Sequence, residues 1–302
     1  MNPILWTQKQ DAGPSARQFP AMAYDSSRGR TVLFGGGTGT TALTGLNDTW
    51  EWDGEYWTQV ADTGPPGRLQ AVMAYDVHRN QTVLFGGMSG GVFKGDTGGW
   101  DGRNWTPLAD SGPSRRVNSA MAYDSKRQRI VLFGGEHAAS IGPAADTWLW
   151  DGAAWTQAPV TGPSARYRHA VAYDSIRDRT VLFGGFDEKT GALLGDTWEW
   201  NGSEWTKVSD SGATPCGMAS LAFKGDSVAL FGGASGTTSN LIYGSTWTWD
   251  GRNWTLRQHF GPSPRYGPNM CYDGKRGTLV LYGGGSGTRV FSTDTWEHSE
   301  GP

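Results

Sequence analysis

Hydrophobic and polar positions alternate along the chain in short runs that return at a fixed interval. The clearest run is Val-Leu-Phe or a close variant followed by two glycines, and it occurs six times at spacings of 48 to 51 residues. The glycine pairs are Gly35-Gly36, Gly86-Gly87, Gly134-Gly135, Gly184-Gly185, Gly232-Gly233 and Gly283-Gly284. A period of this length that does not drift indicates one structural unit repeated six times.

Each unit holds four alternating runs separated by turn residues. It opens with a Gly-Pro-x-x-Arg loop, continues to Tyr-Asp, turns into the run before the glycine pair, and after a variable loop reads Asp-Thr-Trp-x-Trp, Asp-Gly and Trp-Thr. Asp-Gly between alternating apolar residues favours a two-residue hairpin. The unit is therefore predicted as four antiparallel strands, a to d, with no helix. Six such units close into a β-propeller.

We therefore expect an all-β fold, a single six-bladed β-propeller over residues 1–302. The blades are expected at about 13–63, 64–111, 112–161, 162–211, 212–260 and, for the last, 261–302 together with 1–12. The last unit ends after its c strand, whereas residues 1–12 hold a lone d-type segment around Trp6. The N-terminal strand is thus predicted to complete the last blade, which removes an open edge and closes the ring.

The glycine pair at the end of strand b and the two aromatic positions on strand c resemble those of the kelch family of propellers. The likeness covers essentially the whole chain in six copies. Three positions depart from the repeated pattern. Gly98 stands where the other units have a Trp, His298 replaces a second Trp, and Cys216 replaces a loop arginine. The resemblance implies that a ligand would be held on the face made by the d–a and b–c loops.

The residues that follow the repeat are expected to build the scaffold. All 16 tryptophans fall on three positions of the unit, so we expect them to pack between blades rather than to stack on sugars. The Asp-x-x-Arg pairs of the a–b turns are expected to be turn contacts. The loop arginines are expected to bond carbonyl groups between blades. Function is left to the residues that break the repeat.

The variable positions lie just after the loop arginine and just after the glycine pair. Aromatic, Met, polar and charged side chains gather there, which is typical of a binding pocket. The predicted ligand-binding residues are Phe19, Gln70, Met88, Asn118, Glu136, His137, Tyr167, Arg168, Phe186, Asp187, Met218 and Tyr266. The polar groups concentrate on the third and fourth blades, where His169 and Glu188 also lie.

These positions favour a propeller that binds a small polar molecule or a peptide at the mouth of the channel. The alternative is an isomerase, lyase or cyclase in which Glu136, His137 and Arg168 do acid–base and anion-binding work. No nucleophile elbow or zinc helix is present, and the sites of kelch enzymes are not matched residue by residue. No cofactor is predicted, although Glu136, His137 and Asp187 would suit iron or manganese.

Charge and cysteine content limit the remaining classes. The formal net charge of −3, without a basic cluster, argues against a nucleic-acid or membrane surface. No apolar run is long enough to span a membrane, and the first residues do not form a signal peptide. We therefore expect a cytoplasmic protein, although secretion after removal of a signal stays open. We also expect a monomer. Cys216 and Cys271 differ by six positions in the repeat register, too far to bridge, so two free thiols are expected.

Overall fold

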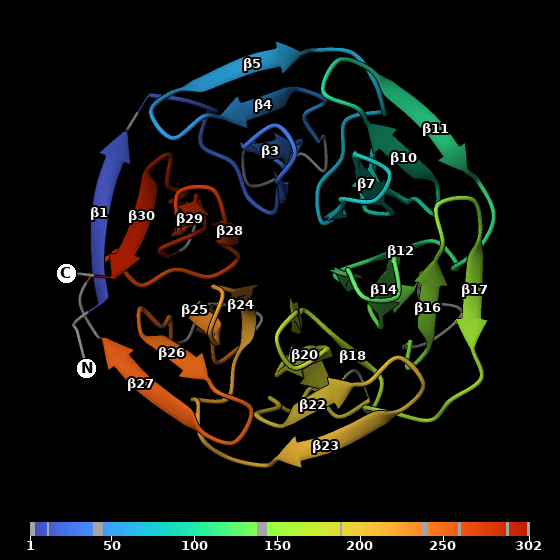
Figure 1. Cartoon of the computed structure of the whole chain (residues 1–302). Helices are drawn as coiled ribbons and strands as arrows, with labels where there is room; N and C mark the ends of the chain where they lie inside the picture. The colour runs from blue at the N-terminus through green and yellow to red at the C-terminus, as the bar shows by residue number, and fades with distance from the viewer. Residues whose placement is uncertain are drawn as a thin grey trace.

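The computed structural model describes residues 4–10, 12–38, 45–137, 144–187, 189–236, 241–258, 261–287 and 290–300. These residues form six four-stranded antiparallel sheets, arranged as blades around a central channel (Figure 1). They contain no helix, and hence none of the length and apolarity needed to cross a membrane. The prediction of an all-β, six-bladed propeller is confirmed.

Each blade runs from its inner strand at the channel to its outer strand at the rim. The first three blades are β2 (Ala21–Asp25), β3 (Arg30–Phe34), β4 (Thr49–Trp52) and β5 (Trp57–Ala61); β6 (Val72–Asp76), β7 (Gln81–Phe85), β10 (Thr97–Trp100) and β11 (Trp105–Ala109); and β13 (Ala120–Asp124), β14 (Arg129–Phe133), β16 (Thr147–Trp150) and β17 (Trp155–Ala158). The fourth and fifth are β19 (Ala170–Asp174), β20 (Arg179–Phe183), β22 (Thr197–Trp200) and β23 (Trp205–Ser209); and β24 (Gly217–Phe223), β25 (Val228–Ala234), β26 (Thr246–Trp249) and β27 (Trp254–Gln258). The sixth is β28 (Asn269–Asp273), β29 (Thr278–Tyr282), β30 (Thr295–Glu300) and β1 (Ile4–Gln10).

Short strand pairs outside the blades shape the loops. They are β8 (Met88–Ser89) with β9 (Val92–Phe93), β12 (Arg116–Val117) with β15 (Glu136–His137), and β18 (Arg166–Tyr167) with β21 (Phe186–Asp187). The last two pairs join a d–a loop to the b–c loop of the same blade. They therefore fix the positions that the sequence marks as variable.

The N-terminal strand closes the ring as predicted. β1 pairs antiparallel with β30, with Trp6 opposite His298, and the two strands lie side by side in Figure 1. The ring of His298 lies edge-on to that of Trp6, with centroids 5.4 Å apart, so the last blade keeps an aromatic pair without the usual second Trp. The indole N–H of Trp6 also donates to the hydroxyl of Thr246 in blade 5, at 3.1 Å.

The same hydrogen bond recurs at every boundary between blades. Each d-strand Trp donates its indole N–H to the Thr that precedes the aromatic pair of the preceding blade. The pairs, at 2.7–3.1 Å, are Trp6–Thr246, Trp57–Thr295, Trp105–Thr49, Trp155–Thr97, Trp205–Thr147 and Trp254–Thr197. The tryptophans therefore join blade to blade, as the repeat predicts.

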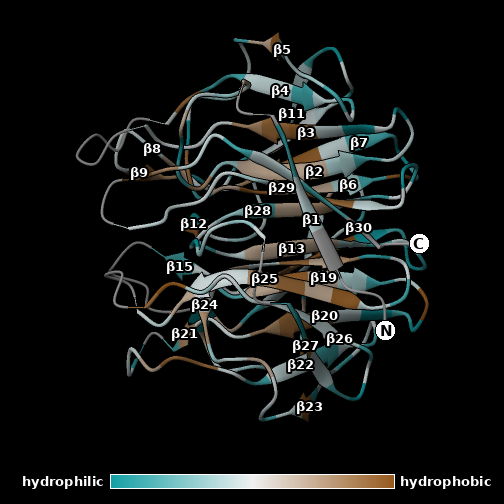
Figure 2. Cartoon of the chain, turned by 90° about the vertical axis from the view of Figure 1, so that its left-hand side faces the viewer, coloured by the Kyte–Doolittle hydropathy of each residue, from teal (hydrophilic) through white to brown (hydrophobic). Residues whose placement is uncertain are grey.

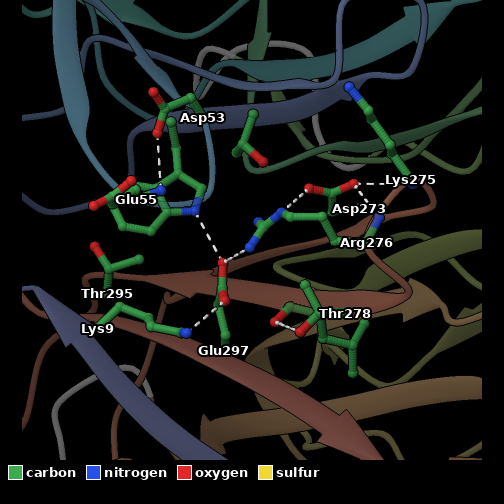
Figure 3. Close-up of polar contacts among 12 residues, drawn as sticks. Lys9, Asp53, Glu55, Asp273, Lys275, Arg276, Thr278, Thr295 and Glu297 are labelled. Atoms are coloured by element: carbon green, nitrogen blue, oxygen red, sulfur yellow. Dashed lines mark hydrogen bonds and ion pairs between the residues drawn. The ribbon is translucent and has the colours of Figure 1, made fainter.

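The turn arginines take part in these boundaries too. In blade 6, Arg276 bonds Asp273 at 2.6 Å and also contacts Glu297, which Lys9 of β1 approaches from the other side (Figure 3). Glu297 then accepts the indole N–H of Trp52 in blade 1, at 3.0 Å. The turn ion pairs are thus structural, as expected, and they orient the acceptor for the next blade.

Glu51 and Glu199 fill the same role in blades 1 and 4, where they accept the indole N–H of Trp100 and Trp249. Blades 2, 3 and 5 have Gly99, Leu149 and Thr248 in place of the glutamate. The indole N–H of Trp150, in blade 3, is buried and has no hydrogen-bond partner within the described part of the chain. The boundary between blades 2 and 3 therefore lacks the indole hydrogen bond that a glutamate accepts at three other boundaries.

The loop arginines bond within their own blade, so the expectation of bonds between blades is wrong. Arg116 is fully buried and donates to the carbonyl of Gly134 at 3.0 Å and to both carboxylate oxygens of Asp146 at 2.6 and 2.8 Å. The reason is that the Asp after each b–c loop lies in the same blade and supplies a bidentate acceptor. In blade 5 both partners are replaced, by Cys216 and Ser245.

The glycine pairs form the backbone contact between neighbouring blades. Gly35 has φ +67°, and a Cβ at this position would lie 2.6 Å from the carbonyl oxygen of Arg68 in the next blade. The amide of Gly36 donates to the same oxygen at 2.9 Å. Both cysteines are free and buried, which confirms two thiols without a bridge.

Candidate functional site

The d–a and b–c loops lie at one end of the propeller, where Figure 2 also shows β8, β9, β12, β15 and β21. At this end the second residue after each loop arginine, or after Cys216, has a left-handed backbone with φ between +50° and +60°. These six residues, called the mouth ring, are Phe19, Gln70, Asn118, Arg168, Met218 and Gly267. A non-glycine residue pays about 1 kcal/mol or more for this conformation, and such strain is concentrated at functional sites.

Backbone hydrogen bonds hold the mouth ring in its strained conformation. The amide of a ring residue donates to the carbonyl of the ring residue in the preceding blade, at 2.7–3.4 Å, in five pairs from Gln70–Phe19 to Gly267–Met218. Each of these bonds satisfies a donor and an acceptor that would otherwise face the channel. The mouth is therefore a rigid rim rather than a set of independent loop tips.

A cavity of about 140 Å³ lies inside the mouth ring. All six ring residues line it, and Ser119, His169 and Asn269 form part of its floor. It continues into a channel cavity of about 510 Å³, whose described lining is mainly Ala, Met, Val and Tyr and includes no Asp, Glu, Lys or Arg. The mouth has room for several waters or one small ligand, and it carries the charge that the channel lacks.

Arg168 is the charged member of the mouth ring. Its guanidinium carbon lies 5.7 Å from the ring centre of Phe19, across the channel, and 5.8 Å from that of Tyr167. Nη1 donates to the sulfur of Met218 at 3.5 Å, while Nε is buried without a hydrogen-bond partner among the described residues. Burial lowers the pKa of Arg168, although the charge of Glu136 opposes this shift. A bound anion would restore the hydrogen bonds that this cation has lost to burial.

Glu136 and His137 point in different directions. The carboxylate of Glu136 accepts a short hydrogen bond from the side-chain amide of Asn118, at the mouth. Nε2 of His137 lies 2.8 Å from the hydroxyl of Ser114, beside the loop arginine. Successive residues of a β-strand face opposite sides, so β15 presents only Glu136 to the mouth. The structure therefore brings Glu136, Asn118 and Arg168 together but not His137.

An aromatic cluster supports the side of the mouth nearest Arg168. Phe186 and Met218 are buried, and Phe19, Tyr167 and Tyr266 pack against them. The ring of Phe186 lies 5.5 Å from that of Tyr167, and only 2% of Phe186 is exposed. Phe186 therefore supports the rim from beneath, and the half-buried Tyr167 and Tyr266 pack against it without lining the mouth cavity.

Met88 and Asp187 lie in the b–c loops and do not line the mouth cavity. The backbone of Met88 pairs with those of Leu69 and Phe93 in a small sheet. The carboxylate of Asp187 accepts hydrogen bonds from the amide and hydroxyl of Thr190, and the amide bond holds the pKa of Asp187 below its usual value. Asp187 thus caps its own loop. Glu188 falls outside the described residues.

His169 lines both the mouth and the channel, and the predicted ligand-binding residues do not include it. Its Nε2 lies 3.1 Å from the carbonyl oxygen of Phe133, which can only accept, so Nε2 carries the proton. Burial and the charge of Arg166 lower the pKa of His169 to about 3. The ring is therefore neutral near pH 7, and its buried Nδ1 is an acceptor with no partner in the described ranges.

The sequence held a signal for His169 in the repeat register. The position after each ring residue also varies between blades, and it reads Pro20, Ala71, Ser119, His169, Ala219 and Pro268. These residues lie just before the inner strands, or within β24 in the case of Ala219, and all of them line the mouth cavity. Extending the variable positions by one residue would have found them.

Nothing in the described ranges gathers three metal-ligating side chains in one place. The set of Glu136, His137 and Asp187 is not assembled, because these side chains contact Asn118, Ser114 and Thr190 respectively. The lining of the mouth cavity includes the cation of Arg168, the neutral acceptor of His169 and the ring of Phe19, and the carboxylate of Glu136 contacts the lining residue Asn118. Neither a scan against protein-family models nor a comparison with curated proteins finds a match to this chain.

Proposed function

We propose that this chain is a kelch-type propeller that binds a small polar ligand, or a polar group of a peptide, inside the mouth ring. The observation that carries the proposal is Arg168, a partly desolvated cation with a buried N–H that has no partner among the described residues. A carboxylate would bond to its guanidinium, and Glu136 nearby would suit an ammonium group of the same ligand. The kelch resemblance, which assigns ligands to the d–a and b–c loops, supports the same end of the channel.

The enzymatic alternative has less support from the geometry. An acid–base pair of Glu136 and His137 needs both side chains at one reacting atom, and His137 bonds Ser114 instead. His169 is nearer to the mouth, but with a pKa of about 3 it is a poor proton acceptor at pH 7. Binding without chemistry is therefore the function that these side chains favour.

The remaining expectations belong to the same proposal. We infer a monomer that acts in the cytoplasm, without nucleic acid or membrane. The net charge of −3 supports the lack of a nucleic-acid partner. The two buried free thiols fit a reducing compartment.

The proposal is tested by adding succinate, glutamate and glycine in turn to the purified protein and measuring heat of binding by calorimetry. The Arg168→Met variant, which keeps the length of the side chain, should bind an anionic probe at least about tenfold more weakly, because a hydrogen bond to a charged group contributes about 1.5–3 kcal/mol. Arg103→Met is the matched control, since Arg103 is exposed in a c–d turn at the far end of the propeller. Equal binding by Arg168→Met and the native protein, or no binding of any probe, would refute the proposal.

A further inference from the structure

Blade 2 lacks one tryptophan that each of the other blades has, and the place of this residue can be identified from strand register. Gly98 of β10 lies opposite Leu84 of β7 and Pro107 of β11. In blade 1, Trp50 of β4 lies opposite Leu33 and Gln59 in the same way. Gly98 is therefore the position at which an indole ring is missing.

In four other blades this indole makes the same hydrogen bond. Its N–H donates to the aspartate two residues earlier, the one that also binds the loop arginine. The pairs, at 2.6–2.7 Å, are Trp50–Asp48, Trp148–Asp146, Trp198–Asp196 and Trp296–Asp294. The position thus has a defined preference: a flat ring with one N–H donor directed at a carboxylate.

Asp96 is the corresponding acceptor in blade 2, and it shows the loss of the ring. It still accepts both hydrogen bonds of Arg68, at 2.7 and 2.9 Å. Its side chain, however, is 45% exposed, compared with 14–19% for the four aspartates that an indole covers. The carboxylate therefore keeps its charge and position but has an open side.

A groove of about 450 Å³ occupies the space beside Asp96. Pro65 and Pro66 of the d–a loop form one wall, and Trp105 and Pro107 of β11 form the other. A Cβ built on Gly98 would have its nearest neighbours at 3.7 Å, an ordinary contact distance, so a side chain would enter the groove without strain. Cavities left where an aromatic side chain or other large apolar group is absent bind small aromatic molecules of matching shape.

We propose that this groove is a binding site for the indole ring of a small molecule. The ring lies between the two prolines and Trp105, and its N–H donates to the carboxylate of Asp96. The four equivalent tryptophans supply the geometry, and the charge of Asp96 strengthens the hydrogen bond. The groove shares no residue with the mouth ring, so the inference is independent of the function proposed above.

The test uses the whole chain and 5-fluoroindole, with binding followed by fluorine NMR and calorimetry. One equivalent should bind to the native protein, and 5-fluorobenzofuran, which has no N–H, should bind at least about tenfold more weakly. Gly98→Trp, which restores the residue found in the other blades, should abolish binding. The control is Val92→Trp, which adds a tryptophan to an exposed loop of the same blade without filling the groove.

Two further variants keep the test decisive. Gly98→Leu blocks the groove with a smaller side chain if Gly98→Trp does not fold. Trp198→Gly should uncover Asp196 in blade 4 and add a second, weaker site, because Ser164 and Lys207 stand there in place of Pro66 and Pro107. The inference is overturned if the native protein does not bind 5-fluoroindole, if a folded Gly98 variant binds it equally well, or if the benzofuran binds as tightly. Tighter binding of N-acetyltryptophanamide than of indole would assign the groove to a tryptophan of a partner peptide instead.

Discussion

Replacing Arg265 by Cys and Asp294 by Ser together should destabilise the protein far less than the sum of the losses caused by the two single replacements. Arg265 is fully buried and makes hydrogen bonds to Asp294 at 2.7 and 2.9 Å and to the carbonyl of Gly283 at 2.9 Å. Removing one member of such a pair leaves the other without its counter-charge, and Asp294 would keep the indole N–H of Trp296 as a donor; the cost is about 3–5 kcal/mol when the remaining charge is buried. Asp294→Ser should cost a similar amount, because it leaves the guanidinium unpaired.

The double variant Arg265→Cys/Asp294→Ser reproduces the residues that blade 5 already has, Cys216 and Ser245. Neither replacement then leaves a charge without its partner. We expect the double variant to lose no more stability than the worse single variant, which corresponds to a favourable coupling at least as large as the smaller single loss, about 3 kcal/mol or more. Blade 5 makes this outcome physically reasonable, since it forms the same four strands without the pair.

The measurement is urea-induced unfolding of the four proteins at pH 7, followed by circular dichroism. Equal slopes with denaturant concentration would show that the variants unfold the same structure. Arg103→Cys, at an exposed position, serves as a control and should change the free energy of unfolding by no more than about 0.5 kcal/mol. If the double variant loses the sum of the two single losses, the ion pair is not coupled and the reasoning fails.

Three other outcomes follow from the contacts between and within blades. Burial opposes ionisation of the aspartates that bind loop arginines, but the arginine contacts outweigh this effect and lower the pKa values of these aspartates. Their contribution to the free energy of unfolding is therefore complete above the unfolded pKa of about 3.9 and is lost as pH falls through the lower folded pKa values. Melting curves between pH 7 and pH 2.5 should show this loss, and a melting temperature that stays constant below pH 4 would contradict it. Thr246→Val removes the hydrogen-bond acceptor of Trp6, on the strand that closes the ring, and should lower the free energy of unfolding by about 1–3 kcal/mol. Thr49→Val removes the acceptor of Trp105 at an ordinary boundary and should have the same effect. A much larger loss at Thr246 alone would mean that ring closure is weaker than the other boundaries. Gly99→Glu should give the indole N–H of Trp150 the acceptor that it lacks and raise the free energy of unfolding in urea by about 1 kcal/mol. The new side chain needs the flexible end of Gln81 to move aside. No gain in stability would indicate that Gln81 already fills this space better.

The sequence was enough to locate the residues of the mouth ring, but not to predict their backbone conformation or their contacts. The position of Arg168 follows from counting two residues after each loop arginine, and the same count from Cys216 reaches Met218 in blade 5. Its left-handed backbone, its contact with Phe19 across the channel and the buried Nε depend on six blades meeting at one axis. The sequence could not separate Glu136 from His137 either, because the register of β12 with β15 decides which of the two faces the mouth.

The sequence alone determined the six blades, their strand order and the closing role of Trp6, because a repeat forces every copy into the same local structure and the two ends must then complete one blade. It also identified the departures at Gly98, Cys216 and His298. Only the tertiary structure decided what each departure does: His298 preserves an aromatic contact, Cys216 stands with Ser245 in place of an ion pair, and Gly98 leaves an open groove beside Asp96. The physical reason is that a missing side chain has no consequence that can be read along one strand; the consequence depends on whether neighbouring strands and loops fill the space.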